Sequence, residues 1–372
     1  MVILHIITHY FPVVYGAENF AQQLAEQQAK EHTVHVVTGR WRSWWRKTQH
    51  YNGVLIHRTR VIKLRYLQTI LATIPFLLQS RYILKGDSTA TVHTHIYPGM
   101  IVGAFLKILV PNIYLVATIQ GGDIGDYDEV FGPFKTQAKI VISWALNRAD
   151  KVHCVSVNLK KQLASMGVKK NKIVVIPNGI NVDYRQRVNL SRITSKRTIR
   201  FISTSRLENK NNLEELIYIL SQRRRQKPRI TLDIYGSGSL EKKLKLLIQK
   251  LRLTEQIKIK PYLSQNKLKR LLSRYDGFIR LPKQEGFGIS FIEAMASGLI
   301  TIGAVSGGVP EIIFHGKTGY LIDLKRPIRS QFQDIIKQRN HWQTIALAGQ
   351  NEVIKKFSWQ SVYGRMKFLY KD

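Results

Sequence analysis

Residues 281–298 read LPKQEGFGISFIEAMASG, and this stretch decides how the rest of the sequence is interpreted. A short apolar run at 277–281 precedes a loop with two glycines, and the residues up to Gly298 have the composition of a helix. In open α/β sheets, ligands bind beyond the carboxyl ends of the strands, which is where this loop falls. Glycines let the backbone approach a ligand closely, and free N–H groups at a helix start favour an anion. The stretch therefore predicts a ligand site in an α/β domain.

Two carboxylates belong to this predicted site. Glu285 stands at the entrance of the loop, and Glu293 lies inside the helix, about two turns further on. One carboxylate can therefore address the near end of a ligand and the other a more distant pair of hydroxyl groups. Because carboxylates accept hydrogen bonds from sugar hydroxyls, the pair suits a polyhydroxylated ligand.

The same alternation of apolar runs and helical segments fills the whole chain, as expected of parallel sheets with crossover helices. Strands are predicted at 2–8, 33–39, 53–59, 90–95, 113–120, 151–157 and 172–177, and again at 199–205, 229–236, 256–262, 277–282 and 299–304. Helices are predicted at 17–30, 134–147, 212–224, 240–251, 265–275 and 289–297. The fold class is therefore α/β, with two Rossmann-like doubly wound domains.

The length of 372 residues exceeds the usual size of one domain. The segment 189–200 is polar and poor in large apolar residues, so we interpret it as the interdomain connection. We expect an N-terminal domain at 1–188 and a C-terminal domain at 189–356. The aromatic and basic tail, 357–372, is expected to form a final helix that packs back on the N-terminal domain.

Charge is the unusual bulk property of this chain. Lys and Arg total 58 against 24 acidic residues, a formal charge of +34, which attracts nucleic acid, anionic lipid or phosphate-rich substrates. The single cysteine, Cys154, excludes an internal disulfide framework and fits a reducing compartment. The N-terminal residues have no basic region or cleavage site and are interpreted as a first buried strand rather than a signal peptide.

The Glu285–Glu293 spacing, in the context EGFGxxxxEAMAxG after a strand, resembles the signature of the family-4 retaining glycosyltransferases, the group 1 glycosyl transferases with the GT-B fold. The resemblance extends over nearly the whole chain. It implies that the two Rossmann-like domains face each other across a cleft, with an acceptor-binding, membrane-facing domain at 1–188 and a nucleotide-sugar-binding domain at 189–356. Further matching elements, in family order, are YGAE at 15–18, IPNGI at 176–180, Arg206 with Lys210, YGSG at 235–238 and GGVPE at 307–311.

The resemblance implies a role for each matching residue. Arg206 and Lys210 would neutralise the donor diphosphate, and Glu285 would orient the donor sugar. Glu293 would hold the ribose hydroxyls of the donor. The other implied donor-binding positions are Gly16, Gly286, Phe287, Gly288, Ile289 and Leu263. The resemblance also implies retention of anomeric configuration and a site with no metal and no cofactor, the nucleotide-sugar being the donor substrate.

The acceptor side departs from the family pattern. Gln120 follows a predicted strand where many members place a histidine, and an amide cannot titrate. Asp123 or His95 could take the proton-transfer role instead. His93 and His95 are also compatible with plain packing, and a zinc pair would need further ligands. The turn at 236–238 is equally compatible with a purely conformational role.

A cationic and tryptophan-rich segment predicts docking on an anionic membrane surface, because indoles prefer the interface and cations meet anionic lipid. Its residues are Arg40, Trp41, Arg42, Trp44, Trp45, Arg46 and Lys47. The apolar stretch 66–84 is interrupted by polar residues and Pro75, so we expect helices that are partly core and partly interface-facing rather than a membrane span. The alternative is that the indoles pack internally.

We therefore expect a peripheral enzyme at the cytoplasmic face of the cell membrane, with a role in polysaccharide biosynthesis. It would move a hexose or N-acetylhexosamine from a UDP- or GDP-sugar to a lipid-linked or polysaccharide acceptor. The alternative is a catalytically silent protein on the same fold that binds nucleotide-sugars or polyanions. Nucleic acid is disfavoured as a partner because no recognisable nucleic-acid module is present.

Overall fold

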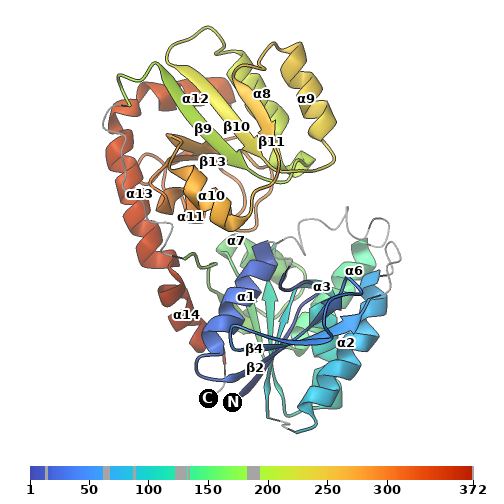
Figure 1. Cartoon of the computed structure of the whole chain (residues 1–372). Helices are drawn as coiled ribbons and strands as arrows, with labels where there is room; N and C mark the ends of the chain where they lie inside the picture. The colour runs from blue at the N-terminus through green and yellow to red at the C-terminus, as the bar shows by residue number, and fades with distance from the viewer. Residues whose placement is uncertain are drawn as a thin grey trace. The chain divides into compact units, whose positions relative to one another are not determined.

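The computed structural model of the chain divides into two compact units (Figure 1). Unit 1 comprises Met1–Gly179 and Val362–Asp372, and unit 2 comprises Ile180–Ser361. The structure describes residues 1–12, 16–61, 68–86, 89–121, 132, 135–181 and 193–370. For residues 68–70 it describes the backbone but not the side chains. The segment 189–200, expected to connect two domains, lies partly outside these residues.

Unit 1 is built on an eight-stranded sheet in the order β3-β4-β2-β1-β5-β6-β7-β8. Its strands are β1 (Val2–Ile6), β2 (Thr33–Arg40), β3 (Thr48–Tyr51), β4 (Val54–Arg60), β5 (Thr91–His95), β6 (Tyr114–Ile119), β7 (Lys151–Cys154) and β8 (Ile173–Val175). All neighbours are parallel except β3, which pairs antiparallel with β4. The short and partly exposed β3 has no long apolar run, so the sequence did not indicate it.

The helices of unit 1 are α1 (Gly16–Gln28), α2 (Gln68–Leu84), α3 (Ile96–Leu109), α6 (Lys135–Arg148) and α7 (Val157–Ser165). The strand predicted at 151–157 ends early because Ser156 caps α7, its hydroxyl accepting the Leu159 N–H at 3.1 Å. Among the described residues, no helix combines the length and the apolar character that crossing a membrane requires.

Unit 2 holds a six-stranded, wholly parallel sheet in the order β11-β10-β9-β12-β13-β14. Its strands are β9 (Thr198–Thr204), β10 (Arg229–Tyr235), β11 (Ile257–Lys260), β12 (Gly277–Ile279), β13 (Ile300–Ala304) and β14 (Tyr320–Ile322). Its helices are α8 (Leu213–Ser221), α9 (Glu241–Lys250), α10 (Gln265–Leu272), α11 (Ile289–Ala296), α12 (Ile328–Lys337) and α13 (Trp342–Phe357). The prediction of an α/β fold with two parallel sheets is confirmed.

The C-terminal segment 357–372 contains a short helix of its own. Phe357 ends α13, Ser358 has an extended backbone, and α14 (Trp359–Lys367) begins directly after it. The last residues then join unit 1, where the Lys367 amine contacts the Glu31 carboxylate at 2.8 Å.

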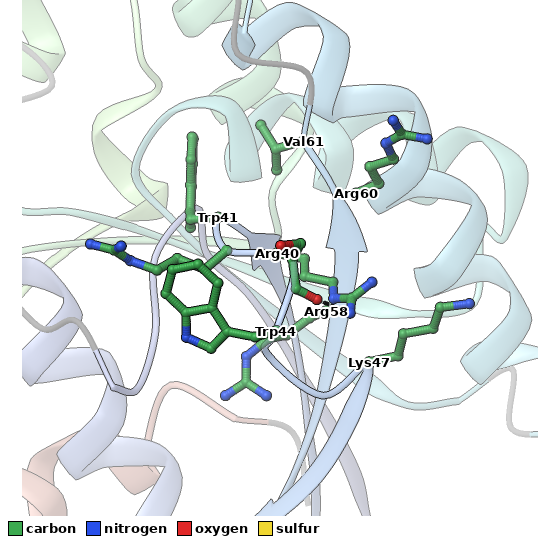
Figure 2. A pocket seen from close by; sticks show the side chains of 9 residues that line it. Arg40, Trp41, Trp44, Lys47, Arg58, Arg60 and Val61 are labelled. Carbon is green, nitrogen blue, oxygen red and sulfur yellow. Dashed lines mark hydrogen bonds between the residues drawn. The ribbon is translucent and has the colours of Figure 1, made fainter.

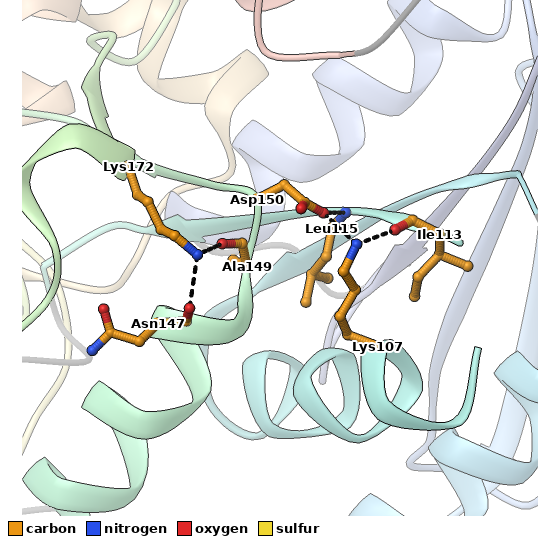
Figure 3. Close-up of polar contacts among 7 residues, drawn as sticks. All are labelled: Lys107, Ile113, Leu115, Asn147, Ala149, Asp150 and Lys172. Atoms are coloured by element: carbon orange, nitrogen blue, oxygen red, sulfur yellow. Dashed lines mark hydrogen bonds and ion pairs between the residues drawn. The ribbon is translucent and has the colours of Figure 1, made fainter. Parts of the chain in front are cut away.

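Two lysines and one aspartate tie helix ends to strand starts in unit 1 (Figure 3). The Asp150 carboxylate accepts from the Lys107 amine at 2.8 Å and from the Leu115 N–H at 2.7 Å, which joins α3, β6 and β7. The Lys172 amine donates to the carbonyls of Asn147 and Ala149, at 2.8 and 2.7 Å. Because these carbonyls end α6, the cation satisfies the negative end of that helix.

Four buried histidines line one face of the unit 1 sheet. His5 pairs in register with His93, and Thr118 stands in register between His95 and His153, so all five side chains share this face. All four histidines are 0% exposed. Burial lowers the pKa of His5 and His153 to about 4 and places those of His93 and His95 well below the ordinary value, so the rings are neutral.

Because the rings are neutral, each has one N–H donor and one acceptor nitrogen, which fixes the donor and the acceptor of every hydrogen bond among these side chains. The His153 Nε2–H must donate to the Ile176 carbonyl, at 2.7 Å, which leaves His153 Nδ1 to accept from the Thr118 hydroxyl at 2.9 Å. Thr118 in turn accepts from His93 Nε2 at 2.6 Å, and His93 Nδ1 accepts from the Tyr370 hydroxyl at 2.7 Å. The C-terminal segment is thereby bonded to the centre of the unit 1 sheet.

The histidine network predicts that unit 1 loses stability in mild acid. In the unfolded chain each histidine binds a proton near pH 6.5, whereas in the folded state it stays neutral down to about pH 4 or lower. The free energy of unfolding should therefore fall as the pH drops from 6.5 towards 4, by up to about 1.4 kcal/mol per pH unit for each histidine. Urea unfolding of the whole chain between pH 7 and 5 measures this slope.

The slope, rather than the absolute stability, identifies the histidines as its source. His153→Gln removes one of the four titrating groups and should therefore reduce the pH dependence of the unfolding free energy by the contribution of one histidine. An unfolding free energy that stays constant between pH 7 and 5 in the unmodified chain would contradict this account of the network.

Candidate active site

The loop between β12 and α11 holds Glu285 in a fixed position. Glu285 is half-buried, and its Oε2 lies 3.0 Å from Nη2 of Arg280, whose side chain is only 10% exposed. Gly288 precedes α11 with φ of +103°, a left-handed backbone that favours glycine. The sequence-predicted carboxylate therefore stands directly before a helix N-terminus, at the carboxyl edge of the unit 2 sheet.

Arg280 binds three separate segments at once. Besides Glu285, its Nη1 donates to the Ser290 hydroxyl at 2.7 Å and its Nη2 to the side-chain Oδ1 of Asn211 at 2.9 Å. The Asn211 amide then donates to the backbone carbonyl of Arg206 at 2.7 Å. One buried guanidinium thus couples the Glu285 loop, the start of α11 and the Arg206 segment. Sequence reasoning missed this residue, although a lone cation that ends a buried apolar run was its signal.

The backbone of Glu285 is clamped from the opposite side by two glycines. Gly308 donates its N–H to the Glu285 carbonyl at 3.0 Å. Gly307 has φ of +54°, and a Cβ there would lie 1.8 Å from the same carbonyl oxygen. No side chain fits at Gly307, so the GGVPE segment is a structural support of the Glu285 loop.

Arg206 and Lys210 occupy the loop after β9, which neighbours both β10 and β12 in the sheet. Lys210 contributes its carbonyl to the Lys283 N–H at 2.8 Å, a direct link to the Glu285 loop. Arg206 is exposed and Lys210 is half-buried. The structure therefore brings the loops of Glu285, Arg206 and Lys210 together at one edge of unit 2.

The turn after β10 packs on this same loop. A Cβ on Gly236 would lie 1.9 Å from the Ser205 carbonyl oxygen, so that glycine is required by the close approach of two backbones. The Glu208 carboxylate accepts from the Ser239 hydroxyl at 2.6 Å and from its N–H at 3.0 Å, and these hydrogen bonds lower the pKa of Glu208. These contacts give the 236–238 turn a conformational role.

The remaining donor-binding predictions are placed as follows. Glu293 is 5% exposed on α11, and Phe287 is 3% exposed with its ring against Phe357, so only the backbone of Phe287 can face a ligand. Gly286, Ile289 and Leu263 are half-buried. Gly16 is the first residue of α1 in unit 1.

In unit 1, the acceptor predictions fall at the ends of β5 and β6. The His95 Nε2 donates to His5 Nδ1 at 2.9 Å, while His95 Nδ1 is buried without a hydrogen-bond partner among the described residues. The Gln120 carbonyl accepts from the Asn178 amide at 2.8 Å, which ties β6 to the IPNGI segment. Asp123 lies outside the described residues. Neither His95, whose pKa burial lowers strongly, nor Gln120 is a base suited to neutral pH.

His5, His93 and His95 each offer a ring nitrogen within 4.8 Å of the others, a spacing that could hold a metal ion. Five of their six nitrogens are already engaged, with His5 Nε2 on the Gln28 carbonyl at 2.6 Å and the others as described above. A metal would have to displace these hydrogen bonds. The expectation of a site without metal stays a prediction.

The three tryptophans predicted to dock on a membrane do not share one exposed face. Trp41 stacks on His9 with ring centroids 4.4 Å apart and donates its indole N–H to the Thr8 carbonyl at 2.9 Å. Trp45 lies under the Arg58 guanidinium. Trp44 alone is largely exposed, at 71%. Membrane docking by this segment stays a prediction. Of the three indoles, only that of Trp44 is exposed enough to contact a membrane, together with the exposed cations beside it.

Comparison with known proteins matches the two units to two glycosyltransferase families. Residues 190–344 match the family Glycosyl transferases group 1, and residues 14–184 match Glycosyltransferase Family 4. The chain is a group 1 glycosyltransferase of the GT-B fold. This confirms the group 1 family and the GT-B fold that the Glu285–Glu293 motif predicted, whereas retention of anomeric configuration stays a prediction.

Three known proteins illustrate the similarity. The glycosyltransferase is 28% identical over 239 residues to the UDP-N-acetylglucosamine–peptide N-acetylglucosaminyltransferase GtfA subunit of Streptococcus pneumoniae, with 62% of this chain and 45% of that protein covered. It resembles the sucrose-phosphate synthase of Thermosynechococcus elongatus with a TM-score of 0.83 at 19% identity, covering 99% and 98% of the two chains. HepE of Anabaena, solved with UDP-glucose, follows with a TM-score of 0.76 at 18% identity, covering 99% and 98%.

Arg280 should be essential for transfer because it positions Glu285. Arg280→Gln leaves the Glu285 and Asn211 oxygens without their charged donor, so we expect the rate of sugar transfer to fall at least about tenfold. Arg280→Lys keeps the charge but cannot reach three partners, and should recover part of that rate. The exposed Arg274→Gln serves as the matched control. A folded Arg280→Gln variant with an unchanged rate would refute the positioning role.

Proposed function

We propose that this glycosyltransferase moves a sugar, with retention of anomeric configuration, from a UDP- or GDP-sugar to a lipid-linked or polysaccharide acceptor at the cytoplasmic membrane face. The observation that carries the proposal is the immobilised Glu285 on a loop joined to the loop of Arg206 and Lys210. A carboxylate fixed in this way can accept hydrogen bonds from a sugar, while two nearby cations can receive a diphosphate leaving group.

The chemical step follows from these charges. Departure of the nucleoside diphosphate builds negative charge, which Arg206 and Lys210 would stabilise more in the transition state than in the ground state. The Glu285 carboxylate would orient the donor sugar, and the backbone of Gly286 to Ile289 would line it. Because His95 and Gln120 are poor bases at neutral pH, we assign the acceptor proton to an oxygen of the leaving phosphate and name no protein nucleophile.

The names of two similar proteins support a UDP-sugar as the donor. GtfA is named for UDP-N-acetylglucosamine, and HepE was solved with UDP-glucose. We therefore place a UDP-hexose or UDP-N-acetylhexosamine first among the donors to be tried. This choice is consistent with Glu293, whose carboxylate on α11 would anchor the ribose, a group that all nucleotide-sugars share.

Membrane association is supported by an exposed apolar ridge on α2. Ile74, Leu78 and Tyr82 are 63%, 64% and 69% exposed and follow one another at every fourth residue, so they lie on one side of the helix. The exposed cations Arg81 and Lys85 lie close to the ridge in sequence. An exposed apolar helix face beside cations suits the interface of an anionic bilayer.

The neighbouring helices extend this apolar surface. α2 packs against α3, and α3 packs against α6, along one side of the unit 1 sheet (Figure 1). Exposed apolar side chains on α3 and α6 are Phe105, Ile108, Leu109, Ile140 and Val141. The combined helix layer is the surface that we propose faces the membrane.

Two substitutions test the enzyme assignment. Glu285→Gln should abolish most turnover, and Arg206→Ala should lower kcat/KM for the donor about 10²-fold, since a fixed charge on the leaving group is lost. Donor consumption and product formation are measured with a panel of nucleotide-sugars. Glu255→Gln and Arg224→Ala, both exposed in unit 2, are the matched controls. Binding of the donor without turnover by the unmodified chain would instead favour a catalytically silent binder.

The apolar ridge is tested with vesicles. Replacement of Ile74, Leu78 and Tyr82 by Ser should reduce co-sedimentation with phosphatidylglycerol vesicles at least about fivefold, because each buried side chain contributes on the order of 1 kcal/mol or more. Leu246→Ser, at a position 65% exposed on α9, is the control. Equal binding by the ridge variant and the control would exclude this surface.

A further inference from the structure

A basic cavity opens beside the carboxyl ends of β2 and β4 in unit 1. Its volume is about 710 Å³, and its lining includes Arg42, Trp44, Lys47, Arg58 and Arg60 (Figure 2). In Figure 2, the indoles of Trp41 and Trp44 lie on the left and the side chains of Lys47, Arg58 and Arg60 on the right. The volume falls within the range of small-molecule sites, and the carboxyl edge of a parallel sheet is where such sites form.

Arg58 is the buried cation of this cavity. The residue is 5% exposed, and no carboxylate among the described residues pairs with it. Its Nη2 donates to the Phe11 carbonyl at 2.8 Å and its Nη1 to the Arg46 carbonyl at 3.2 Å, while its Nε has no partner. Burial lowers the pKa of Arg58, yet an arginine stays charged. An interior charge without a counter-ion is costly, so a bound anion would stabilise it.

The described lining of the cavity contains no carboxylate, and none lies close by in the sequence. Between Glu31 and Asp87 the chain contains neither aspartate nor glutamate. The Glu18 carboxylate lies 3.9 Å from His9, on which Trp41 stacks. The positive potential of the cavity is therefore available to a ligand.

The loop that forms the cavity wall is held in place before any ligand binds. Arg40 donates from Nε to the Trp45 carbonyl at 2.7 Å and from Nη2 to the Ser43 carbonyl. The Trp41 indole is fixed by the Thr8 carbonyl, and the Arg42 guanidinium lies 5.0 Å from the Trp44 ring centre. Because these groups are positioned in advance, binding would cost little ordering entropy.

We propose that this cavity binds a diphosphate group carried by the acceptor of the transfer reaction. Several cations that line one concave site match clustered negative charges, and Trp44 offers an apolar surface for whatever the diphosphate is attached to. A nucleic-acid strand would need successive exposed aromatics, and Trp44 is the one largely exposed indole of the segment. The acceptor's identity rests on the proposed function, whereas the diphosphate site itself does not.

Inorganic pyrophosphate is the first probe. Its affinity is measured by calorimetry, and by Trp44 fluorescence with Trp44→Phe to identify the signal, in a chain that carries Arg206→Gln and Lys210→Gln so that unit 2 does not contribute. Adding Arg42→Gln, Lys47→Gln and Arg60→Gln should weaken binding at least about tenfold. Arg58→Gln, whose fold is checked by circular dichroism, should have a similar effect.

A matched control separates the cavity from net charge. Lys85→Gln, Lys161→Gln and Lys170→Gln remove the same charge from exposed positions of unit 1 and should change pyrophosphate affinity less than about twofold. Equal losses in the two triple variants, or no binding by the chain with an intact cavity, would overturn the diphosphate site. Since no sugar transfer is measured, failure of the enzyme assignment leaves this result unaffected.

Vesicles then distinguish an acceptor from a lipid headgroup. Phosphatidylcholine vesicles that contain a polyprenyl diphosphate should bind the chain more tightly than phosphatidylcholine vesicles in which phosphatidylglycerol supplies the same amount of negative charge. The Arg42, Lys47 and Arg60 variant should lose this preference. Equal binding to both vesicles would overturn the assignment to the acceptor, as would tighter binding of a single-stranded oligonucleotide that quenches Trp44.

Discussion

The ion pair between Arg280 and Glu285 is the interaction on which the unit 2 site depends. A buried guanidinium needs a charge partner and further acceptors, and here Glu285, Ser290 and Asn211 supply them from three segments. These contacts hold the Glu285 carboxylate in place. The backbone carbonyl of Glu285 is held by the N–H of Gly308 and by the close approach of Gly307. The contacts that compensate the burial of Arg280 therefore also fix the position of the Glu285 carboxylate, the group that would contact the sugar.

Much of the fold could be predicted because its signals are local. Buried parallel strands are continuous apolar runs, and the glycine loop before α11 has its own sequence signature. Strands β3 and β14 and the capped start of α7 escaped because they are short or depend on a single side chain. Arg280, Asn211 and Arg58 escaped for a different reason: their partners come from distant segments, so only the folded chain shows that these polar groups are buried and shared.

The whole chain carries a formal charge of +34, and the cations of unit 1 that contribute to it have two kinds of surroundings. Some cations end helices or pair with carboxylates, as Lys172 and Lys107 do. Others, around Arg58 and Trp44, line a cavity whose described lining contains no carboxylate. The histidines, in contrast, stay neutral because burial lowers their pKa, and they bond the C-terminal segment to the sheet. The same excess of basic residues thus supports the fold in one place and leaves a binding potential in another.

A crystal structure of the chain with a bound UDP-sugar tests the central claim most directly. The account predicts that the sugar hydroxyls lie within hydrogen-bond distance of the Glu285 carboxylate, that Arg280 keeps its contact with Glu285, and that the diphosphate lies against Arg206 and Lys210. A donor bound elsewhere, or a Glu285 side chain turned away from the bound sugar, would contradict it.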